Sequence, residues 1–308
     1  MTCADLPALE TEDQPLLDTL RARGAEASAV VWNDPAIDWT SYDIAVLRST
    51  WDYTDHYDDF LAWASSVPRL VNPPNVVRWN LDKHYLQRLA DHGLDVVETS
   101  WLEPEHNFDK RALHNRFPAR EDFVIKPAIS AGSKDTGRYT ATDADSRRYA
   151  IEHADRLLRE GRSVMVQRYI PEVDSVGESA LIFLHGTFSH AVRKDAMLTP
   201  GEDAVVDGLY KPEQMSAHRA TDAEIQAAQN VLAFARARIP GRSPASRPLL
   251  YARVDLVTPS AGTPVLMELE LVEPSLFFSL AAGSLERFAD AILAELRMGP
   301  DTHNIAMA

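Results

Sequence analysis

Apolar positions in the first 75 residues alternate between the spacing of a helix and that of a strand. Leu16, Leu17 and Leu20 share one face of a helical run that ends at Gly24. We therefore predict a small α/β domain with parallel strands at residues 1–75, in which residues 1–3 supply only the end of a first strand. The predicted elements are a helix at 13–24, strands at 27–32 and 43–48, a helix at 57–67 and a strand at 69–72, before Asn72-Pro73-Pro74 interrupts the pattern.

Beyond these prolines the chain is richer in strand patterns, which predicts antiparallel sheets in two further domains, at 76–175 and 176–300. Turn signals such as His185-Gly186 and the segment 259–262 separate neighbouring strands. A polar stretch at 195–219 without periodicity predicts a functional loop. The predicted strands are 96–102, 122–127, 163–170, 178–186, 187–194, 249–257 and 264–272, and the predicted helices are 81–93, 222–238 and 284–296.

Composition and charge limit the function classes. The most apolar run, at 276–282, is much shorter than the ~20 residues of a membrane helix, so no membrane span is predicted. A net charge of -15 would repel nucleic acid. The single cysteine, Cys3, excludes intrachain disulfides and thiolate metal clusters, which fits a reducing cytoplasmic location.

Two acidic strands form the most informative pattern. Strand alternation places Arg253 and Asp255 on one face of 251–257, and Glu268 and Glu270 on one face of the next strand. If the intervening turn pairs these strands, an arginine and three carboxylates meet, and hard oxygen ligands suit Mg²⁺ or Mn²⁺. The alternative is a solvated polar face with ion pairs to Arg253.

A second candidate is the stretch FVIKPAISAGSKDTGRY at 123–139. Lys126 ends an apolar run, and Ser130, Gly132 and Ser133 follow it with backbone and hydroxyl donors suited to phosphate. The order differs from GxxxxGK[ST], because the lysine precedes the glycine. A solvated strand edge is the alternative.

Polar residues also follow the strand at 43–48, where ligands of open α/β sheets often bind. Arg48, Ser49, Thr50 and Asp52 could contact a substrate, and Arg48 could bind a carboxylate. An aromatic packing corner with an incidental arginine is the alternative.

Two further residues are ambiguous on their own. Glu178 begins an apolar strand and could accept hydrogen bonds from a ribose, but on its own the pattern favours an ordinary core strand with a surface glutamate. Lys83 lies near the start of a helix.

The motifs HExxH, GxSxG and GxGxxG are absent, which weakens hydrolase and dinucleotide-binding hypotheses. A glycosidase with Asp255 and Glu268 as its carboxylate pair stays open; it requires carboxyl groups ~5 to 9.5 Å apart.

The order of these segments along nearly the whole chain resembles the ATP-grasp superfamily. The segments are NLDKHYL, FVIKPAISAGS, VQRYI, ESALIFLHGTFSHAVRK, ARVDLV and MELELVEPSLF. Within the superfamily the chain looks most like the small bacterial ligases of the D-cycloserine synthetase type. The resemblance implies a mixed α/β and α+β fold, with a small parallel amino-terminal domain and two antiparallel-sheet lobes that clasp ATP.

The resemblance also implies roles for individual residues. ATP contacts would come from Lys83, Lys126, Ser130, Ser133, Gln167, Tyr169, Ile170 and Glu178, with residues 130–133 as a lid. Catalytic contacts to phosphate would come from Arg253, Lys126, Arg193 and, with less support, Lys194; Mg²⁺ (or Mn²⁺) would bind Asp255, Glu268 and Glu270; and substrate would face Arg48, Ser49, Thr50, Asp52 and Ser275. Many members have Glu-x-Asn where this chain has Glu268-x-Glu270, and Glu273 could compete for the same metal.

The implied activity is ATP-dependent formation of an amide or related C–N bond through an acyl phosphate on a small amino-acid-like substrate, with ring closure as one case. An intermolecular amino-acid or dipeptide ligase, and an ATP-binding protein without catalysis, stay open as alternatives. The expected partners are a small carboxylate or amine substrate and, from base rates alone, a second copy of the chain in a homodimer.

Overall fold

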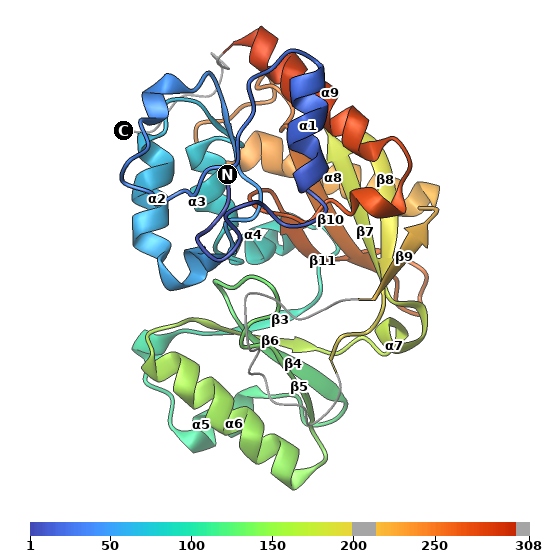
Figure 1. Ribbon diagram of the computed structural model, residues 1–308. Coiled ribbons are helices and arrows are strands. Elements are labelled where there is room, and N and C mark those ends of the chain that lie inside the picture. Colours follow the sequence, from blue (N-terminus) through green and yellow to red (C-terminus); the bar gives the residue numbers. More distant parts are fainter. Residues whose placement is uncertain (199–213, 300–308) are drawn as a thin grey trace.

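Three β-sheets organise the chain, which a computed structural model describes at residues 1–198 and 214–299. A five-stranded antiparallel sheet in the order β11-β10-β7-β8-β9 lies above a four-stranded antiparallel sheet in the order β3-β6-β4-β5, and β1-β2 form a parallel pair (Figure 1). The strands are β1 (Ala45–Val46), β2 (Leu70–Val71), β3 (Thr99–Leu102), β4 (Asp122–Pro127), β5 (Gly137–Thr140), β6 (Val164–Arg168), β7 (Glu178–Leu184), β8 (Thr187–Lys194), β9 (Met215–His218), β10 (Tyr251–Val257) and β11 (Val265–Glu270). The α-helices are α1 (Gln14–Ala22), α2 (Tyr57–Ser66), α3 (Pro74–Asn80), α4 (Tyr85–Asp91), α5 (Lys110–Arg116), α6 (Ala144–Arg159), α7 (Glu172–Val176), α8 (Asp222–Arg238) and α9 (Ser284–Met298).

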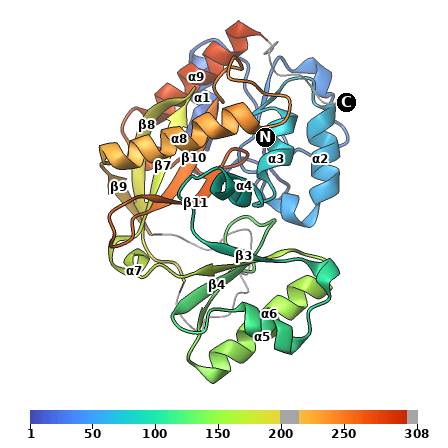
Figure 2. The same cartoon turned by 180° about the vertical axis from the view of Figure 1, so that it is seen from behind.

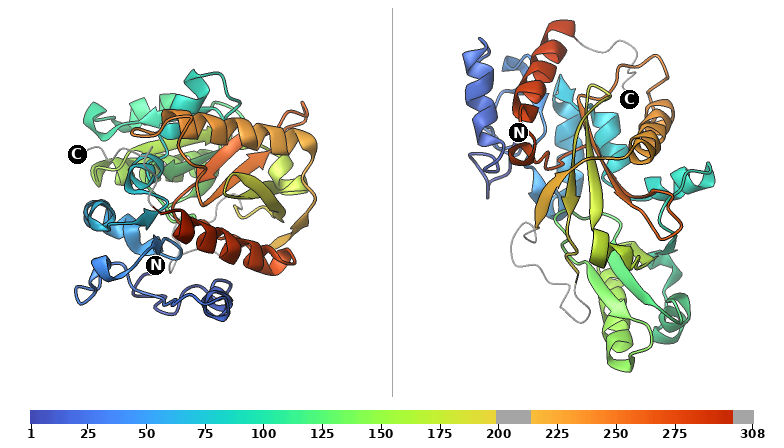
Figure 3. Two further views of the ribbon diagram at one scale, coloured as in Figure 1. Left: turned by 90° about the horizontal axis from the view of Figure 1, so that it is seen from above. Right: turned by 90° about the vertical axis from the view of Figure 1, so that its right-hand side faces the viewer.

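Helices cover both faces of the five-stranded sheet. Helix α8 packs on one face, and α9 with α1 packs on the other (Figures 2 and 3). The alternation of β7 explains this arrangement, because Leu181 and Phe183 join the core under α8 while Ala180 and Ile182 join the core under α9. Both faces of the strand are therefore apolar along this part of its length.

The face under α9 changes from apolar to charged toward the four-stranded sheet. On β7, Glu178 continues the row of Ala180 and Ile182, and on β10, Arg253 continues the row of Tyr251. Burying a charge without compensation is costly, so a charged continuation of a core face indicates a cavity or ion pairs. Glu178 and Arg253 both line a cavity and both form ion pairs.

The four-stranded sheet is covered on one face by α5 and α6. Leu113 of α5 and Ala150 and Leu157 of α6 pack on Phe123 and Ile125 of β4. The sequence pattern predicts β3, β4 and β6 but neither β5 nor these two helices. The side chain of Asp143 caps α6 by accepting a hydrogen bond from the Ser146 amide at 2.7 Å.

The amino-terminal region contains the predicted parallel pair, with Ala45 opposite Leu70. The strand predicted at 27–32 is wrong, because this segment contributes only a bridge between Val31 and Thr2. Thr2 also bridges to Ser49, and a turn from Cys3 ends the pairing. Most of the polar loop predicted at 195–219 lies outside the described residues. Near the end of this stretch the chain forms strand β9.

A buried ion pair fastens the amino-terminal region to the rest of the chain. The Arg48 guanidinium donates to both oxygens of Asp13 at 3.0 Å, and the two side chains are 3% and 6% exposed. The guanidinium also lies near the rings of Tyr251 and Phe288, at 5.6 and 5.4 Å from their centroids. Arg48 therefore links the start of α1 to β10 and α9.

Replacing Arg48 with methionine is expected to lower the free energy of unfolding by about 3–5 kcal/mol, because Asp13 would remain buried without a counter-charge. Urea denaturation measures this change. The double variant Arg48→Met/Asp13→Leu is expected to recover most of the loss. Arg21→Met, which breaks an exposed pair with Asp18, should cost less than about 1 kcal/mol. Equal losses in Arg48→Met and Arg21→Met would contradict the anchoring role.

Candidate active site

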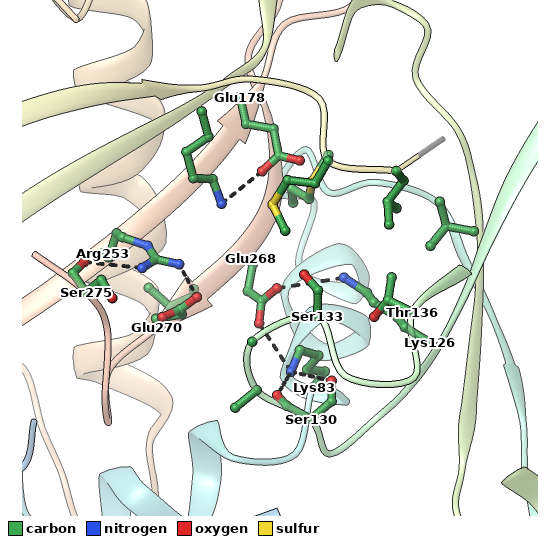
Figure 4. Close-up of a pocket in the computed structure, with 18 of the residues that line it drawn as sticks. Lys83, Lys126, Ser130, Ser133, Thr136, Glu178, Arg253, Glu268, Glu270 and Ser275 are labelled. Atoms are coloured by element: carbon green, nitrogen blue, oxygen red, sulfur yellow. Dashed lines mark hydrogen bonds and ion pairs between the residues drawn. The ribbon is translucent and has the colours of Figure 1, made fainter. Parts of the chain in front are cut away.

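The charged ends of the central strands face a cavity of about 450 Å³. Lys126 and Gln167 of the four-stranded sheet line it from the other side, and Trp51 and Tyr53 contribute from the amino-terminal region. Figure 4 shows Lys83 and Lys126 directed toward Glu268 within this space. The cavity is therefore enclosed by three separate regions of the chain.

A β-bulge determines which residue of β8 faces the cavity. The register of the β7–β8 hairpin shifts beyond Ile182, where Ser189 is the additional residue. As a result Glu178 pairs with Lys194, whereas a regular hairpin would pair it with Arg193. Directly opposite residues point to the same face, so Lys194 lines the cavity with Glu178.

A second bulge acts in the same way between β10 and β11, where Met267 is the additional residue. Asp255 therefore pairs with Glu268, and Arg253 pairs with Glu270. Without the bulge, the two glutamates would lie on the face opposite that of Arg253 and Asp255. The predicted meeting of one arginine with three carboxylates is thus present, and it depends on this additional residue.

Two lysines from different elements hold Glu268. Lys83 lies 3.2 Å from one carboxylate oxygen, and Lys126 lies 3.8 Å from the other. Lys83 also donates to the backbone carbonyl of Ser130 at 2.7 Å. Burial alone would raise the pKa of Glu268, but the lysine charges outweigh it and the pKa is lowered; burial lowers the pKa of Lys126.

Asp255 lies behind the cavity wall and fixes two cations. Its carboxylate is 2% exposed and accepts hydrogen bonds from Arg253 at 2.9 and 3.0 Å and from Lys194 at 2.8 Å. Lys194 also contacts Glu178 at 3.0 Å, and Arg253 donates to Glu270. This network fixes the positions of the cations that face the cavity.

Glu270, the last residue of β11, and Glu273, three residues beyond it, have raised pKa values. Burial raises the pKa of Glu270 to about 8, although Arg253 acts in the opposite direction. Burial also raises the pKa of Glu273 to about 7, against the charge of Lys83 and a hydrogen bond with the Tyr53 hydroxyl. Both carboxyl groups would ionise more readily if a cation bound beside them.

The loop after β4 closes the cavity toward the amino-terminal region. Ser130, Ser133 and Thr136 line the cavity, and the Tyr53 hydroxyl donates to the Ser130 carbonyl at 3.3 Å. Lys134 in the same loop pairs with Asp55 at 2.8 Å. Ser130 of the predicted lid segment 130–133 therefore contacts both Tyr53 and Lys83 in this structure. Thr136 lines the cavity but was not predicted from the sequence.

The cavity end next to the four-stranded sheet is mainly apolar. Gln167, Tyr169 and Ile170 line it, and the Gln167 amide donates to Thr99 at 2.8 Å. Tyr169 and Ile170 pack with Met267 of β11 and with Val97 from the segment before β3. Val124 of β4 and Leu269 of β11 also line the cavity.

Arg193 lies away from the cavity, on the opposite face of β8. Its guanidinium contacts the His218 ring at 2.9 Å and lies 3.9 Å from Glu224 at the start of α8. The bulge at Ser189 is the physical reason, because it moves Lys194 into the position where a regular hairpin would place Arg193.

The predicted substrate residues of the amino-terminal region do not line the cavity either. Arg48 is bound to Asp13, Ser49 and Thr50 are buried, and Asp52 accepts a hydrogen bond from Trp32 at 2.8 Å. The neighbouring aromatic residues Trp51 and Tyr53 line it instead, as do Glu10 and Glu12 from the loop before α1. Ser275, the remaining predicted substrate residue, also lines the cavity. The sequence indicated an aromatic packing corner at Trp51 and Tyr53, whereas no sequence pattern predicted that Glu10 or Glu12 would line a cavity.

The carboxylates fit a metal ion that is shared with phosphate rather than an all-protein metal site. Within residues 1–198 and 214–299, no three His, Cys, Asp or Glu side chains are grouped closely enough to hold a metal ion. Glu268 and Glu270 both line the cavity, and one or two carboxylates with phosphate oxygens are the usual ligands of Mg²⁺. The donor chemistry therefore suits Mg²⁺ bound together with a nucleotide.

Comparisons with known proteins show which family the chain belongs to. Residues 1–72 match the family model described as the N-terminal domain of D-cycloserine synthetase DcsG. The cycloserine biosynthesis protein DcsG of Streptomyces lavendulae is 36% identical over 290 residues, which covers 92% of this chain and 93% of that protein. The chain belongs to the D-cycloserine synthetase family. The resemblance inferred from the sequence motifs is confirmed.

Solved structures show the ATP-grasp fold. The crystal structure of D-cycloserine synthetase DcsG has a TM-score of 0.83 and 35% identity, with 96% of this chain and 98% of that chain covered. The ATP-grasp ligase PsnB, in a complex with a precursor variant, Mg and ADP, has a TM-score of 0.56 at 18% identity, with 94% and 96% covered. The predicted fold class is confirmed for this member of the D-cycloserine synthetase family. Its described helices include none that is long and apolar enough to cross a membrane.

The raised pKa of Glu273 predicts a pH-dependent stability without ligand. The ordinary pKa of this group is 4.5 and the folded value is about 7, so the stability that the neutral carboxyl contributes is lost as pH rises through this range. Between pH 5 and pH 8, wild type is expected to lose about 1–3 kcal/mol more unfolding free energy than Glu273→Gln does. Urea denaturation at the two pH values measures this difference.

The exposed Glu26 supplies the control for this measurement, since Glu26→Gln should follow wild type at both pH values. If the unfolding free energies of wild type and Glu273→Gln change by the same amount between pH 5 and pH 8, the prediction is refuted.

Proposed function

We propose that this chain is an ATP-dependent ligase that joins the carboxyl group of a small amino-acid-like substrate to a nitrogen atom, with ring closure within one molecule as in D-cycloserine formation. The observation that carries the proposal is the cavity wall on which Lys83, Lys126 and Arg253 alternate with Glu268 and Glu270. Cations beside carboxylates suit a triphosphate bound with a divalent ion. Family membership supports the same activity.

The two ends of the cavity suggest how the nucleotide would bind. The apolar end, with Gln167, Tyr169 and Ile170, would take the adenine base, and Glu178 would accept hydrogen bonds from the ribose. Lys83 and Lys126 would exchange their contacts with Glu268 for phosphate oxygens. The loop at Ser130 and Ser133 would cover the phosphates with its hydroxyl and amide donors.

Glu268 and Glu270 are the proposed Mg²⁺ ligands, because both carboxylates line the cavity. When bound, Mg²⁺ would supply positive charge that offsets the triphosphate. The role of Asp255 as a third ligand stays a prediction. In the structure its carboxylate is bound by Arg253 and Lys194.

The proposed reaction has two steps. A carboxylate oxygen of the substrate forms a bond to the γ-phosphorus while the bond from phosphorus to ADP breaks, which gives an acyl phosphate. A nitrogen atom then bonds to the acyl carbon, phosphate leaves with the oxygen, and the nitrogen loses a proton. Arg253 would stabilise the charge of the transferred group, and the closed loop would exclude water from the acyl phosphate.

Substrate-dependent release of ADP and phosphate tests the proposal. A panel of small amino acids and their O-ureido and amide derivatives is the starting set, and the mass of the product distinguishes ring closure from joining of two molecules. Lys126→Ala and Glu268→Gln are expected to abolish release while the circular dichroism spectrum stays unchanged. Unchanged turnover in both variants would refute the assignment.

Two adjacent residues provide a matched test of the nucleotide site. Lys194 lines the cavity and would contact a phosphate oxygen of ATP. Lys194→Met is therefore expected to weaken Mg·ATP binding by about 10-fold or more, since a charge-assisted contact contributes about 1.5–3 kcal/mol. Arg193→Met removes the same charge from the opposite face and should change the affinity by less than about 3-fold. Isothermal titration calorimetry measures both. A larger effect of Arg193→Met would contradict the proposed role of Lys194.

A further inference from the structure

Glu273 differs from the other carboxylates at this end of the five-stranded sheet. Within the described residues, no lysine, arginine or histidine forms an ion pair with Glu273, although its side chain lines the cavity. Its neighbours on the same wall all have cationic partners. These pairs are Glu178 with Lys194, Glu268 with Lys83 and Lys126, and Glu270 with Arg253.

The backbone around Glu273 is held by side chains from separate elements, although it belongs to neither a helix nor a strand. Each donor binds a different carbonyl of the segment 271–276. The hydrogen bonds are Asn72 to Leu271 at 2.7 Å, Tyr251 to Val272 at 2.7 Å, Trp51 to Glu273 at 3.0 Å, Arg253 to Ser275 at 3.2 Å and His190 to Leu276 at 2.7 Å. An irregular segment fixed in this way holds its side chains in place before a ligand binds.

The segment also brings Glu273 into the same cavity as Glu268 and Glu270, the proposed Mg²⁺ ligands. Glu273 follows Glu270 by three residues, a chain length of at most ~11 Å. Lys83 and Arg253 both act on its carboxylate electrostatically, and the Tyr53 hydroxyl is bonded to it. In an amino acid the ammonium nitrogen is separated from the carboxyl carbon by one carbon atom, so its partner must lie near the reacting carboxyl group.

We propose that Glu273 binds the ammonium group of the substrate and thereby selects acids that carry an amino group next to the carboxyl group to be activated. This inference rests on the proposed function. A half-buried carboxylate that forms no ion pair within the described residues would gain a cation from the substrate, and an acid without the amino group would leave it uncompensated. The raised pKa of Glu273 agrees, because burial without a paired cation disfavours its charged form.

Glu10 and Glu12 also line the cavity but suit this role less well. The Glu10 carboxylate accepts a hydrogen bond from the Glu12 amide at 2.8 Å, and Glu12 accepts one from the Ser279 hydroxyl. These contacts bind the two carboxylates to their own loop and to the segment before α9. Glu273 has the Tyr53 hydroxyl as its partner and lies closer along the chain to the metal-binding glutamates.

The test compares the affinities of two acids in the presence of saturating Mg·AMPPNP, measured by isothermal titration calorimetry on the full chain. The probes are O-ureidoserine and the analogue with hydrogen in place of the amino group. Wild type is expected to prefer O-ureidoserine by about 10- to 100-fold, the range for a hydrogen bond between charged groups. Glu273→Gln should lose this preference while its affinity for the analogue changes by less than about 3-fold.

Glu178→Gln is the matched control, since it removes a cavity carboxylate that is paired with Lys194. It is expected to weaken nucleotide binding but to retain the preference between the two acids. Equal weakening of both acids by Glu273→Gln, or a preference that survives in this variant, overturns the inference. So does a wild type that fails to distinguish the acids or binds neither. ADP release with another acid of the panel would then leave the proposed function standing.

Discussion

Antiparallel pairing places directly opposite residues on the same face of a sheet, and this constraint decides which charges meet in the cavity. In each of the two hairpins of the five-stranded sheet one additional residue, Ser189 or Met267, shifts the register. The first bulge brings Lys194 to Glu178, and the second brings the glutamates of β11 to the face of Arg253 and Asp255. Bulges are frequent beside active sites because they redirect side chains in this way. The charged wall therefore depends on two local irregularities of the backbone pairing.

Compensation of buried charge explains how these side chains are held once they meet. Glu268 is paired with lysines from outside the five-stranded sheet, and Asp255 holds Arg253 and Lys194 from behind. Each charge would be costly to bury alone. Under the proposed function the lysines would exchange Glu268 for phosphate oxygens, and Glu268 would exchange the lysines for a divalent ion. Charge would then be balanced both before and after the nucleotide binds.

The sequence predicted the elements whose patterns are strong. The alternation in β7, β8, β10 and β11 and the capped helix α8 were recognisable, because period-two and helical spacing reflect burial on a known face. Helix α6 was missed, although Asp143 caps it and its apolar residues recur at helical spacing. The strand predicted at 27–32 was wrong, because apolar content does not show whether a partner of equal length exists.

The candidate site was predicted only in part, for a related reason. Lys126, Glu268 and Glu270 line the cavity, whereas Arg193 and Asp255 do not. A sequence pattern gives the alternation of a strand but not the bulges that change which face a residue occupies. The ion pair of Arg48 with Asp13 could not be predicted either, because the two residues are distant in sequence. In the sequence alone, an arginine in a buried ion pair cannot be distinguished from one that binds a ligand.

The short 3-10 helix Trp51–Asp55 links the two sides of the cavity that a substrate would contact. The Tyr53 hydroxyl contacts the Ser130 carbonyl in the loop after β4 and also interacts with the Glu273 carboxyl group. Trp51 holds the backbone of Glu273. A displacement of this helix would therefore loosen the loop and move Glu273 at the same time. The same few residues therefore hold both the loop and Glu273, the proposed ammonium partner. The amino-terminal region forms only a two-stranded sheet, and its contribution to the cavity comes from these contacts.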